Sequence, residues 1–258
     1  MQHLRRGRHE ARPGKGAGGH RGRNNVDARF AVDQQAKLDF AYQAVQRTTH
    51  ETKSLINRYY GRKPDYSYFM GCSTGGREAM LADPQVRELV RSLADWPGPV
   101  LTSHKSAGHH LHRLEFIADL GLRADDPGMG PIVKRVLKHQ SEQGPFQVLM
   151  NVPRHFGGTG KDVFAWALCD TPVLLYCLLR FGLGKDPRVR QAGKYLLGLV
   201  RDNGWPCAVS PELGRFRGPG RKDDPCPYAN LVMLKALGQD EEWRESGPAR
   251  TGAEVMLD

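Results

Sequence analysis

Long apolar runs are absent from this 258-residue sequence. No stretch reaches the roughly 18 to 20 consecutive apolar residues that a membrane-spanning helix needs. The opening residues, MQHLRRGRHEARPGKG, carry basic side chains with no apolar segment behind them, so the pattern of a secretory signal peptide is missing. The sequence therefore predicts no membrane partner and no export, and favours a cytoplasmic location.

Cysteine is sparse and irregularly placed. The five cysteines are Cys72, Cys169, Cys177, Cys207 and Cys226, and no two of them form a CxxC pair. An odd number at wide spacing argues against a disulfide framework and against a zinc ribbon, and is typical of a reducing compartment. Cys169 and Cys177 lie within apolar helical runs, where free thiols pack as small hydrophobes.

Positive charge dominates, but unevenly. The formal net charge is +10, and residues 1–30 hold seven Arg and one Lys against Glu10 and Asp27, which is 8 − 2 = +6. An arm rich in Gly and Arg buries too little apolar surface to fold, so we expect residues 1–30 to be a disordered basic arm. Such an arm can hold phosphates non-specifically. No aromatic residues are interleaved with its basic residues and no nucleic-acid motif accompanies them, so no specific nucleic-acid partner is predicted.

What the sequence does contain is typical of a globular protein, because 39% of its residues are hydrophobic and another 30 are glycine. Apolar residues recur at helical spacing from Lys37 to Tyr60, and Gly61 then offers a helix stop. Residues 66–70, YSYFM, favour a strand, and they precede GCSTGG and the helix-forming run REAML. The local order is helix, strand, sharp turn, helix.

The turn GCSTGG places Ser73 between two small residues, Gly71 and Gly75. Small residues at these positions let a strand turn abruptly into a helix, which exposes the serine hydroxyl and directs helix N–H groups at an oxyanion. The sequence predicts Ser73 as a nucleophile and the backbone N–H near Thr74 as an oxyanion donor. The alternative is a turn serine retained in an inactive fragment.

This segment, from about Gly19 to Leu81, resembles the tannase and feruloyl esterase family around its nucleophile. The resemblance covers about a quarter of the chain and includes the long helix, YYG, YSYF and GCSTGGR together. It implies that Ser73 attacks an ester carbonyl and that Cys72 bridges to a second Cys beside the catalytic His. The chain has no His-Cys dipeptide to supply that partner, and the resemblance stops before the family's catalytic Asp and His.

Beyond Asp83 only helical patterns occur, and they repeat. Asp126-Pro127 to Gly144 has the same spacing as Asp186-Pro187 to Gly204. Asp before Pro is a helix start signal and Gly is a stop signal, so equivalent helices are predicted to begin at Asp126 and Asp186. A further helix is predicted over 171–181, with Thr171 as its cap. Any strand is expected to lie within residues 66–70.

These repeats, with DNGWP and EQGPF at their ends, resemble the α/α-toroid proteins of the terpenoid cyclase and protein prenyltransferase superfamily over about Asp83 to Gln239. In the prenyltransferases an Asp and a Cys two residues apart ligate zinc, and Asp224 and Cys226 occupy these positions. No His follows His155, and two ligands do not close a zinc site, so neither a metal nor another cofactor is predicted. The acidic Asp-x-Asp-Asp motif of the cyclising enzymes is absent.

Two further groups of residues leave alternatives open. His109, with His110, His112 and His104 nearby, can act as the base for Ser73, or can be solvated at an exposed helix start. The large aromatic residues at the repeat junctions can line a cavity for an apolar ligand or fill the core. These aromatic residues are Trp166, Trp205 and Tyr228.

The sequence as a whole predicts a mainly α chimera, in which a fragment of an α/β-hydrolase precedes partial toroid-like helical hairpins. The predicted parts are the basic arm 1–30, the esterase-like fragment 31–82, the helical repeat domain 83–240 and a C-terminal tail 241–258. Two functions follow. The first is serine-dependent hydrolysis of small aromatic or short-chain esters by Ser73, Thr74 and His109. The alternative is a non-catalytic helical protein that binds an apolar ligand or a protein partner, with the fragment inert.

Overall fold

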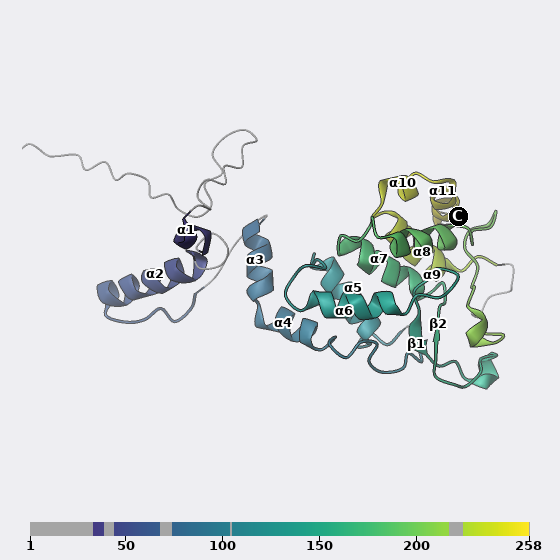
Figure 1. Cartoon of the computed structure of the whole chain (residues 1–258), viewed down its shortest axis with the longest axis horizontal. Coiled ribbons are helices and arrows are strands. Elements are labelled where there is room, and N and C mark those ends of the chain that lie inside the picture. The colour runs from purple at the N-terminus through teal and green to yellow at the C-terminus, as the bar shows by residue number, and fades with distance from the viewer. Residues whose placement is uncertain (1–32, 39–43, 68–73, 104, 217–223, 258) are drawn as a thin grey trace, which may run out of the picture. The chain divides into compact units, whose positions relative to one another are not determined.

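The computed structural model describes residues 33–38, 44–67, 74–103, 105–216 and 224–257, and within them the chain is mainly helical (Figure 1). The chain divides into two compact units, Met1–Phe69 and Met70–Asp258. The predicted basic arm, residues 1–30, lies outside the described residues. His104 also lies outside the described residues, and so do residues 71–73 of the predicted turn, which include Cys72 and Ser73.

In the first unit, the helix predicted from Lys37 to Tyr60 is confirmed for α2 (Ala44–Tyr60), and Lys37 and Leu38 belong to a separate element, α1 (Gln34–Leu38). Residues 39–43 between them lie outside the described part. Helix α2 ends directly before Gly61, whose φ of 69° is the left-handed conformation that only glycine adopts without cost. Of the predicted strand, Tyr66 and Ser67 are in irregular structure, and residues 68–70 lie outside the described part.

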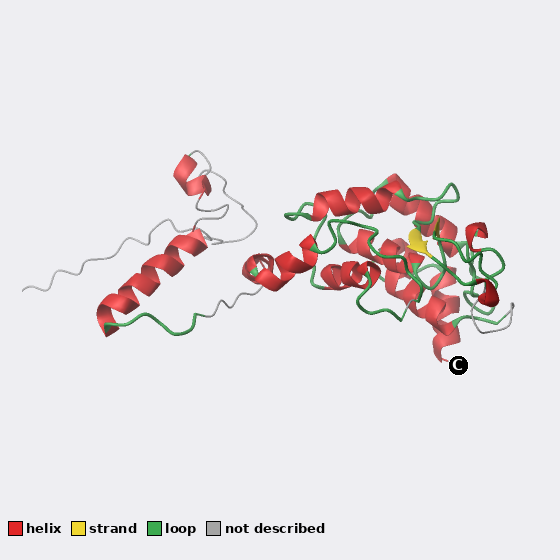
Figure 2. Cartoon of the chain, turned by 90° about the horizontal axis from the view of Figure 1, so that it is seen from below, coloured by secondary structure: helices red, strands yellow, loops and turns green. Residues whose placement is uncertain are grey.

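The described residues of the second unit form helices and a small two-stranded sheet (Figure 2). Its elements are α3 (Thr74–Ala82), α4 (Pro84–Arg91), α5 (His110–Asp119), α6 (Met129–Lys138), β1 (Val148–Met150), η3 (Arg154–Phe156), β2 (Val163–Ala165), α7 (Thr171–Arg180), α8 (Pro187–Leu197), η4 (Pro211–Leu213), α9 (Pro227–Leu237), α10 (Glu241–Arg244) and α11 (Gly247–Leu257). Helix α7 packs against α5, α8 and α9, and α9 packs against α10 and α11. Helix α3 contacts α4, which contacts α5.

Helix α7 lies at the centre because its sequence, TPVLLYCLLR, is apolar on every face. All residues from Thr171 to Leu178 are buried, as expected for a helix without a polar stripe. The helix begins at Thr171, one residue earlier than predicted: Asp170 holds the cap position, and the Thr171 hydroxyl donates to the carbonyl of Phe146 at 3.0 Å.

The two predicted Asp-Pro helix starts have different outcomes. Asp186 is the N-cap of α8, and its carboxylate accepts a hydrogen bond from the N–H of Arg188 at 2.9 Å. The prediction for Asp126 is wrong, because α6 begins at Met129 after Gly128, whose φ is 85°. The carboxylate of Asp126 is instead occupied by partners outside the helix, described below.

The prediction that any strand lies within residues 66–70 is also wrong. Strands β1 and β2 pair antiparallel, with Leu149 opposite Phe164. Val148 and Met150 on β1 are buried, and Leu149 between them is partly exposed, which is the alternation expected of a strand with one covered face. A run of three residues is too short for this pattern to stand out in the sequence.

Two domain boundaries differ from those predicted. The second unit, called the helical body below, begins at Met70 rather than at residue 83. Helix α3 therefore belongs to the helical body, although it follows the esterase-like sequence. Residues 241–257 are not a tail, since they form α10 and α11. Trp243 of α10 is buried, and the Arg190 guanidinium lies 4.2 Å from its ring while donating to Asp240 at 2.6 Å.

The large aromatic residues at the repeat junctions mostly fill the core. Trp205 is fully buried and donates its indole N–H to the carbonyl of Leu196 at 2.9 Å. The buried amide of Asn230 accepts from the N–H of Trp205 and donates to its carbonyl, both at 3.0 Å. Trp166 is buried as well, whereas Tyr228 is half-buried.

No helix in the part of the chain that the structure describes is long and apolar enough to cross a bilayer. The partial toroid-like arrangement of helical hairpins over residues 83–240 stays a prediction.

Candidate functional site

The predicted nucleophile turn leads directly into helix α3. Ser73 itself, and the side chain of Thr74, lie outside the described residues. Helix α3 begins at Thr74, which is the residue where a GxSxG turn must become a helix. The first N–H groups of a helix have no partner within it, so the start of α3 supplies hydrogen-bond donors beside Ser73.

One helical turn further, Arg77 joins α3 to the segment between α5 and α6. Its Nη1 donates to the carbonyl oxygen of Gly121 at 2.9 Å, and its Nη2 donates to the carboxylate of Asp126. The other oxygen of Asp126 accepts from the N–H of Arg123 at 2.6 Å. The Asp126 side chain is only 8% exposed, so its charge depends on these donors.

His109, the predicted base, is the N-cap of α5. Its Nδ1 accepts from the N–H of Leu111 at 3.1 Å, and its Nε2 lies 2.8 Å from the carbonyl oxygen of Pro99 and donates to it. Burial lowers the pKa of His109, although the bond to Pro99 opposes this shift. The ring is therefore neutral, with both nitrogens engaged inside the helical body.

His110 is buried beside it and pairs with Asp95. Its Nε2 lies 2.8 Å from the Asp95 carboxylate, and this hydrogen bond lowers the pKa of Asp95. A solvated histidine cluster, the second alternative from the sequence, is thus wrong for His109 and His110. His112 is partly exposed, and its Nδ1 lies 3.6 Å from Glu115.

The structure does not bring His109 to the point where α3 is anchored. Helix α5 has ten residues, which at 1.5 Å per residue separates its ends by about 15 Å. His109 precedes the first residue of α5, and Gly121, which receives Arg77, follows its last turn. The base role of His109 remains a prediction.

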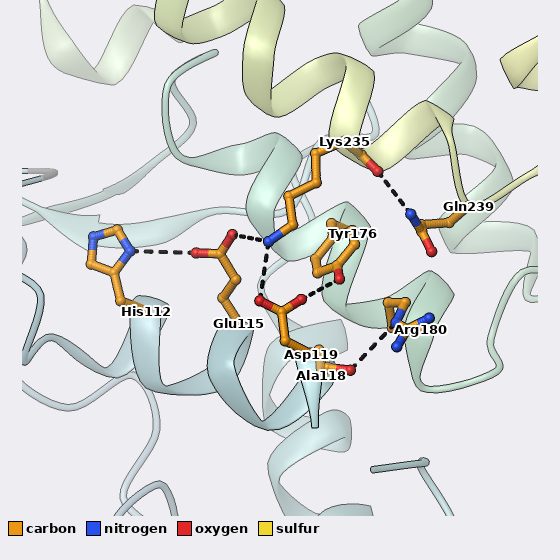
Figure 3. Close-up of polar contacts among 8 residues, drawn as sticks. All are labelled: His112, Glu115, Ala118, Asp119, Tyr176, Arg180, Lys235 and Gln239. Atoms are coloured by element: carbon orange, nitrogen blue, oxygen red, sulfur yellow. Dashed lines mark hydrogen bonds and ion pairs between the residues drawn. The ribbon is translucent and has the colours of Figure 1, made fainter. Parts of the chain in front are cut away.

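A cluster of charged side chains that the sequence analysis missed connects α5, α7 and α9 (Figure 3). Lys235 of α9 donates to Glu115 at 2.7 Å and to Asp119 at 3.2 Å, both on α5. Its Nζ also lies 4.3 Å from the ring of Tyr176 on α7. Burial works against the charged ammonium, but the bonds to Glu115 and Asp119 raise the pKa of Lys235.

The Tyr176 hydroxyl donates to the carboxylate of Asp119 in the same cluster. Burial, together with this hydrogen bond, raises the pKa of Tyr176 to about 12. The signal in the sequence was weak: Glu115 and Asp119 are one helical turn apart, and Lys235 interrupts the apolar run ANLVMLKAL. One ammonium bridges two carboxylates, and the arrangement joins three helices.

The predicted metal candidates, Asp224 and Cys226, lie at the start of α9, where Cys226 is the N-cap. Among the described residues, no group of three or more His, Cys, Asp or Glu side chains is placed to hold a metal ion. The two candidates do not fit the ligand set of a structural or a catalytic zinc site, and we derive no chemistry from a metal.

Two cysteines were expected to be core residues. Cys177 is fully buried. Cys169 is partly exposed, and its thiol donates to the carboxylate of Asp170 at 3.1 Å. Burial raises the pKa of both thiols well above the usual value, so neither is an activated nucleophile. Both are free thiols.

Comparison with known proteins relates the first part of the chain to esterases. Residues 4–85 match the sequence model of the family described as tannase and feruloyl esterase. The chain is 48% identical over 52 residues to mono(2-hydroxyethyl) terephthalate hydrolase of Piscinibacter sakaiensis, which covers 20% of this chain and 9% of that protein. It is 39% identical over 61 residues to feruloyl esterase B of Aspergillus niger, covering 24% of this chain and 11% of that protein.

An uncharacterized esterase of Xanthomonas campestris pv. campestris is 47% identical over 66 residues, which covers 25% of this chain and 11% of the esterase. The chain thus spans about a tenth of the length of the curated relatives it matches. No solved structure matches it. The comparisons support a carboxylic ester hydrolase at the level of the family, through the segment that contains Ser73.

Proposed function

We propose that the chain hydrolyses carboxylic esters with Ser73 as the nucleophile. The observation that carries this proposal is the match of residues 4–85 to the tannase and feruloyl esterase family. That segment includes GCSTGG, and α3 begins directly after its serine. A serine on a sharp turn before a helix presents its hydroxyl to a substrate together with free N–H donors.

In the proposed reaction, the Ser73 oxygen forms a bond with the acyl carbon while its proton passes to a base. Backbone N–H groups at the start of α3, beginning with Thr74, hold the oxyanion of the tetrahedral intermediate. The carbon–oxygen bond to the alcohol then breaks, and the alcohol leaves with a proton. Water hydrolyses the resulting acyl-serine by the same route, which returns Ser73 to its hydroxyl form.

The proposed substrates are esters of small aromatic acids and short-chain aryl esters. This class follows from the relatives, whose names refer to a terephthalate ester and to feruloyl esters. Aryl esters suit a first assay because a good leaving group lessens the need for a general acid. The reaction needs no cofactor or metal, and a cytoplasmic location remains part of the proposal.

The test compares Ser73→Ala with Ser67→Ala on p-nitrophenyl acetate and on a methyl hydroxycinnamate. Removing a true serine nucleophile costs on the order of 10⁶ in kcat in the well-studied case, so Ser73→Ala should abolish measurable turnover. Ser67 is exposed and lies in the same segment, so Ser67→Ala should keep the full rate. Equal turnover in wild type and Ser73→Ala would refute the proposal.

The base is tested separately by the pH profile. A histidine base gives a rate that reaches a plateau above the pKa of the imidazole, whereas attack without a base rises with hydroxide concentration. His109→Asn removes the base but keeps a side-chain oxygen that can cap α5. If His109 is the base, this variant should lose the plateau while α5 stays folded. An unchanged pH profile in His109→Asn would show that a residue other than His109 is the base.

The alternative, a non-catalytic helical binding protein, is supported by none of the comparisons. It becomes the preferred hypothesis if neither ester is turned over in a Ser73-dependent manner.

A further inference from the structure

We infer that Arg77 is a positioning residue, which fixes helix α3 by binding the segment between α5 and α6. The inference rests on the proposed function for its catalytic meaning. Its structural part stands on the contacts of Arg77, Gly121 and Asp126.

The anchor is a two-pronged contact of one guanidinium. Arg77 donates from one nitrogen to the Gly121 carbonyl at 2.9 Å and from another to Asp126. The planar fork of Arg holds two acceptors in one fixed geometry, which a Lys ammonium cannot reproduce. The Arg77 side chain is 31% exposed and that of Asp126 is 8% exposed, so solvent screens this pair only in part.

Asp126 is itself held in place. One carboxylate oxygen accepts from the N–H of Arg123 at 2.6 Å, and the backbone N–H of Asp126 donates to the Arg123 carbonyl at 3.1 Å. Gly121 follows the last turn of α5, where carbonyl oxygens without helical partners carry partial negative charge. The two acceptors are therefore a carboxylate held by a backbone hydrogen bond and a carbonyl oxygen at a helix end, and both favour a cation.

Arg77 lies four residues after Ser73, which is one turn of helix. Fixing Arg77 thus fixes the first turn of α3, whose N–H groups are the proposed oxyanion donors. Donors that are already in place lower the barrier because no reorganisation is needed during the reaction. Asp126 and Gly121 lie beyond residue 85, where the match to the esterase family ends, so the helical body supplies the anchor.

The experiment measures kcat and KM for p-nitrophenyl acetate in wild type, Arg77→Met, Arg77→Lys and Arg91→Met. Arg91 is the matched control, since it pairs with Glu88 at 2.7 Å on α4 but both side chains are about 70% exposed. Active molecules are counted from the burst of p-nitrophenol, so that rates refer to folded enzyme. Hydrogen exchange of the amides in residues 78–82, which donate within α3, is followed in the same samples.

We expect Arg77→Met to lower kcat by about ten- to a hundredfold, the scale of a misplacement of about 1 Å, with KM little changed. Arg77→Lys should recover part of the rate, because its ammonium can still neutralise Asp126. Exchange in residues 78–82 should rise in Arg77→Met, and Arg91→Met should match wild type in every measurement.

The inference would be overturned if Arg77→Met had the same kcat and the same hydrogen exchange as wild type. It would also be overturned if the loss of rate came entirely from a smaller number of active molecules. If Arg77→Met does not fold, Arg77→Lys is the test. A lower kcat with faster exchange than wild type would support the inference, and wild-type values of both would overturn it. The proposed function fails independently if wild type shows no Ser73-dependent turnover. In that case faster exchange in the variants still establishes the anchor, and unchanged exchange refutes it.

Discussion

Helices α2 and α3 both lie within the segment that matches the esterase family, yet their surroundings differ. In α2, the apolar residues Leu55, Tyr59 and Tyr60 are 62%, 83% and 68% exposed. In α3, Met80 and Leu81 pack against the core of the second unit, and Arg77 binds a buried carboxylate. One family segment is therefore divided between two compact units, at a boundary that follows packing rather than sequence similarity.

The difference shows what a nucleophile turn requires beyond its motif. A serine between small residues is a local feature, but the direction of the following helix depends on what that helix packs against. Here the partners of α3 are α4 and the loop after α5. A catalytic role for this segment must therefore be tested in the whole chain.

The largest difference between the two units should appear when one aromatic side chain in each is replaced by alanine and the free energy of unfolding is measured. Trp205→Ala should lower the free energy of unfolding of the second unit by about 3 to 5 kcal/mol, because it leaves a cavity in the core and removes a buried donor. Tyr59→Ala on α2 should change it by no more than about 0.5 kcal/mol. Urea titrations followed by circular dichroism measure both. Similar losses in the two variants would contradict the division into units.

The lysine of the charged cluster should have a smaller effect. Lys235→Met leaves Glu115 and Asp119 without their shared cation and should cost about 1 to 2 kcal/mol, since the ammonium is partly screened by solvent. Lys53→Met on α2, where the side chain is exposed, is the matched control and should be close to neutral. The same urea titration decides, and a neutral Lys235→Met would show that the cluster does not stabilise the fold.

Removing a helix N-cap should change the free energy of unfolding by about 1 kcal/mol in one unit and not in the other. Asp186→Ala removes the N-cap of α8 and should lower the stability of the second unit by about that amount. Asp33 accepts from the N–H of Ala36 at 2.8 Å at the start of α1, and Asp33→Ala should leave the unfolding of the second unit unchanged. An equal shift of the midpoint in both variants would mean that α1 stabilises the helical body.

The smallest expected effect is a loss of stability at high pH. The folded-state pKa of Tyr176 is about 12 against 10.0 for the free side chain, and that of Lys235 is also raised. Both groups hold their protons more tightly when folded, so their contribution is complete below pH 10 and is lost as pH rises from about 10 to 12.

For Tyr176 the loss at pH 10.5 should be less than about 1 kcal/mol relative to pH 8. The urea midpoint measured at both pH values in wild type and Tyr176→Phe isolates this contribution, because the variant should show a smaller decrease. Tyr59→Phe on α2 is the control and should behave as wild type. A decrease of the same size in Tyr176→Phe would assign the alkaline sensitivity to other groups.

Much of the helical body could be predicted where the signal was local. The start of α8 follows from Asp186-Pro187, because the cap accepts from an N–H two residues away. The burial of α7 follows from a sequence with no polar face. The charged cluster could not be predicted, since Lys235 and Glu115 are 120 residues apart in sequence and nothing local selects either as the partner of the other.

The sequence by itself determined that the chain is mainly helical, where α7 and α8 lie and where the esterase-like sequence GCSTGG is placed before α3. The tertiary structure alone decided the role of Asp126, which carries the same Asp-Pro start signal as Asp186. Its carboxylate binds Arg77, 49 residues away, and the N–H of Arg123, and not the first turn of α6. A buried carboxylate takes the strongest donors within reach, and only the packed chain sets which donors these are.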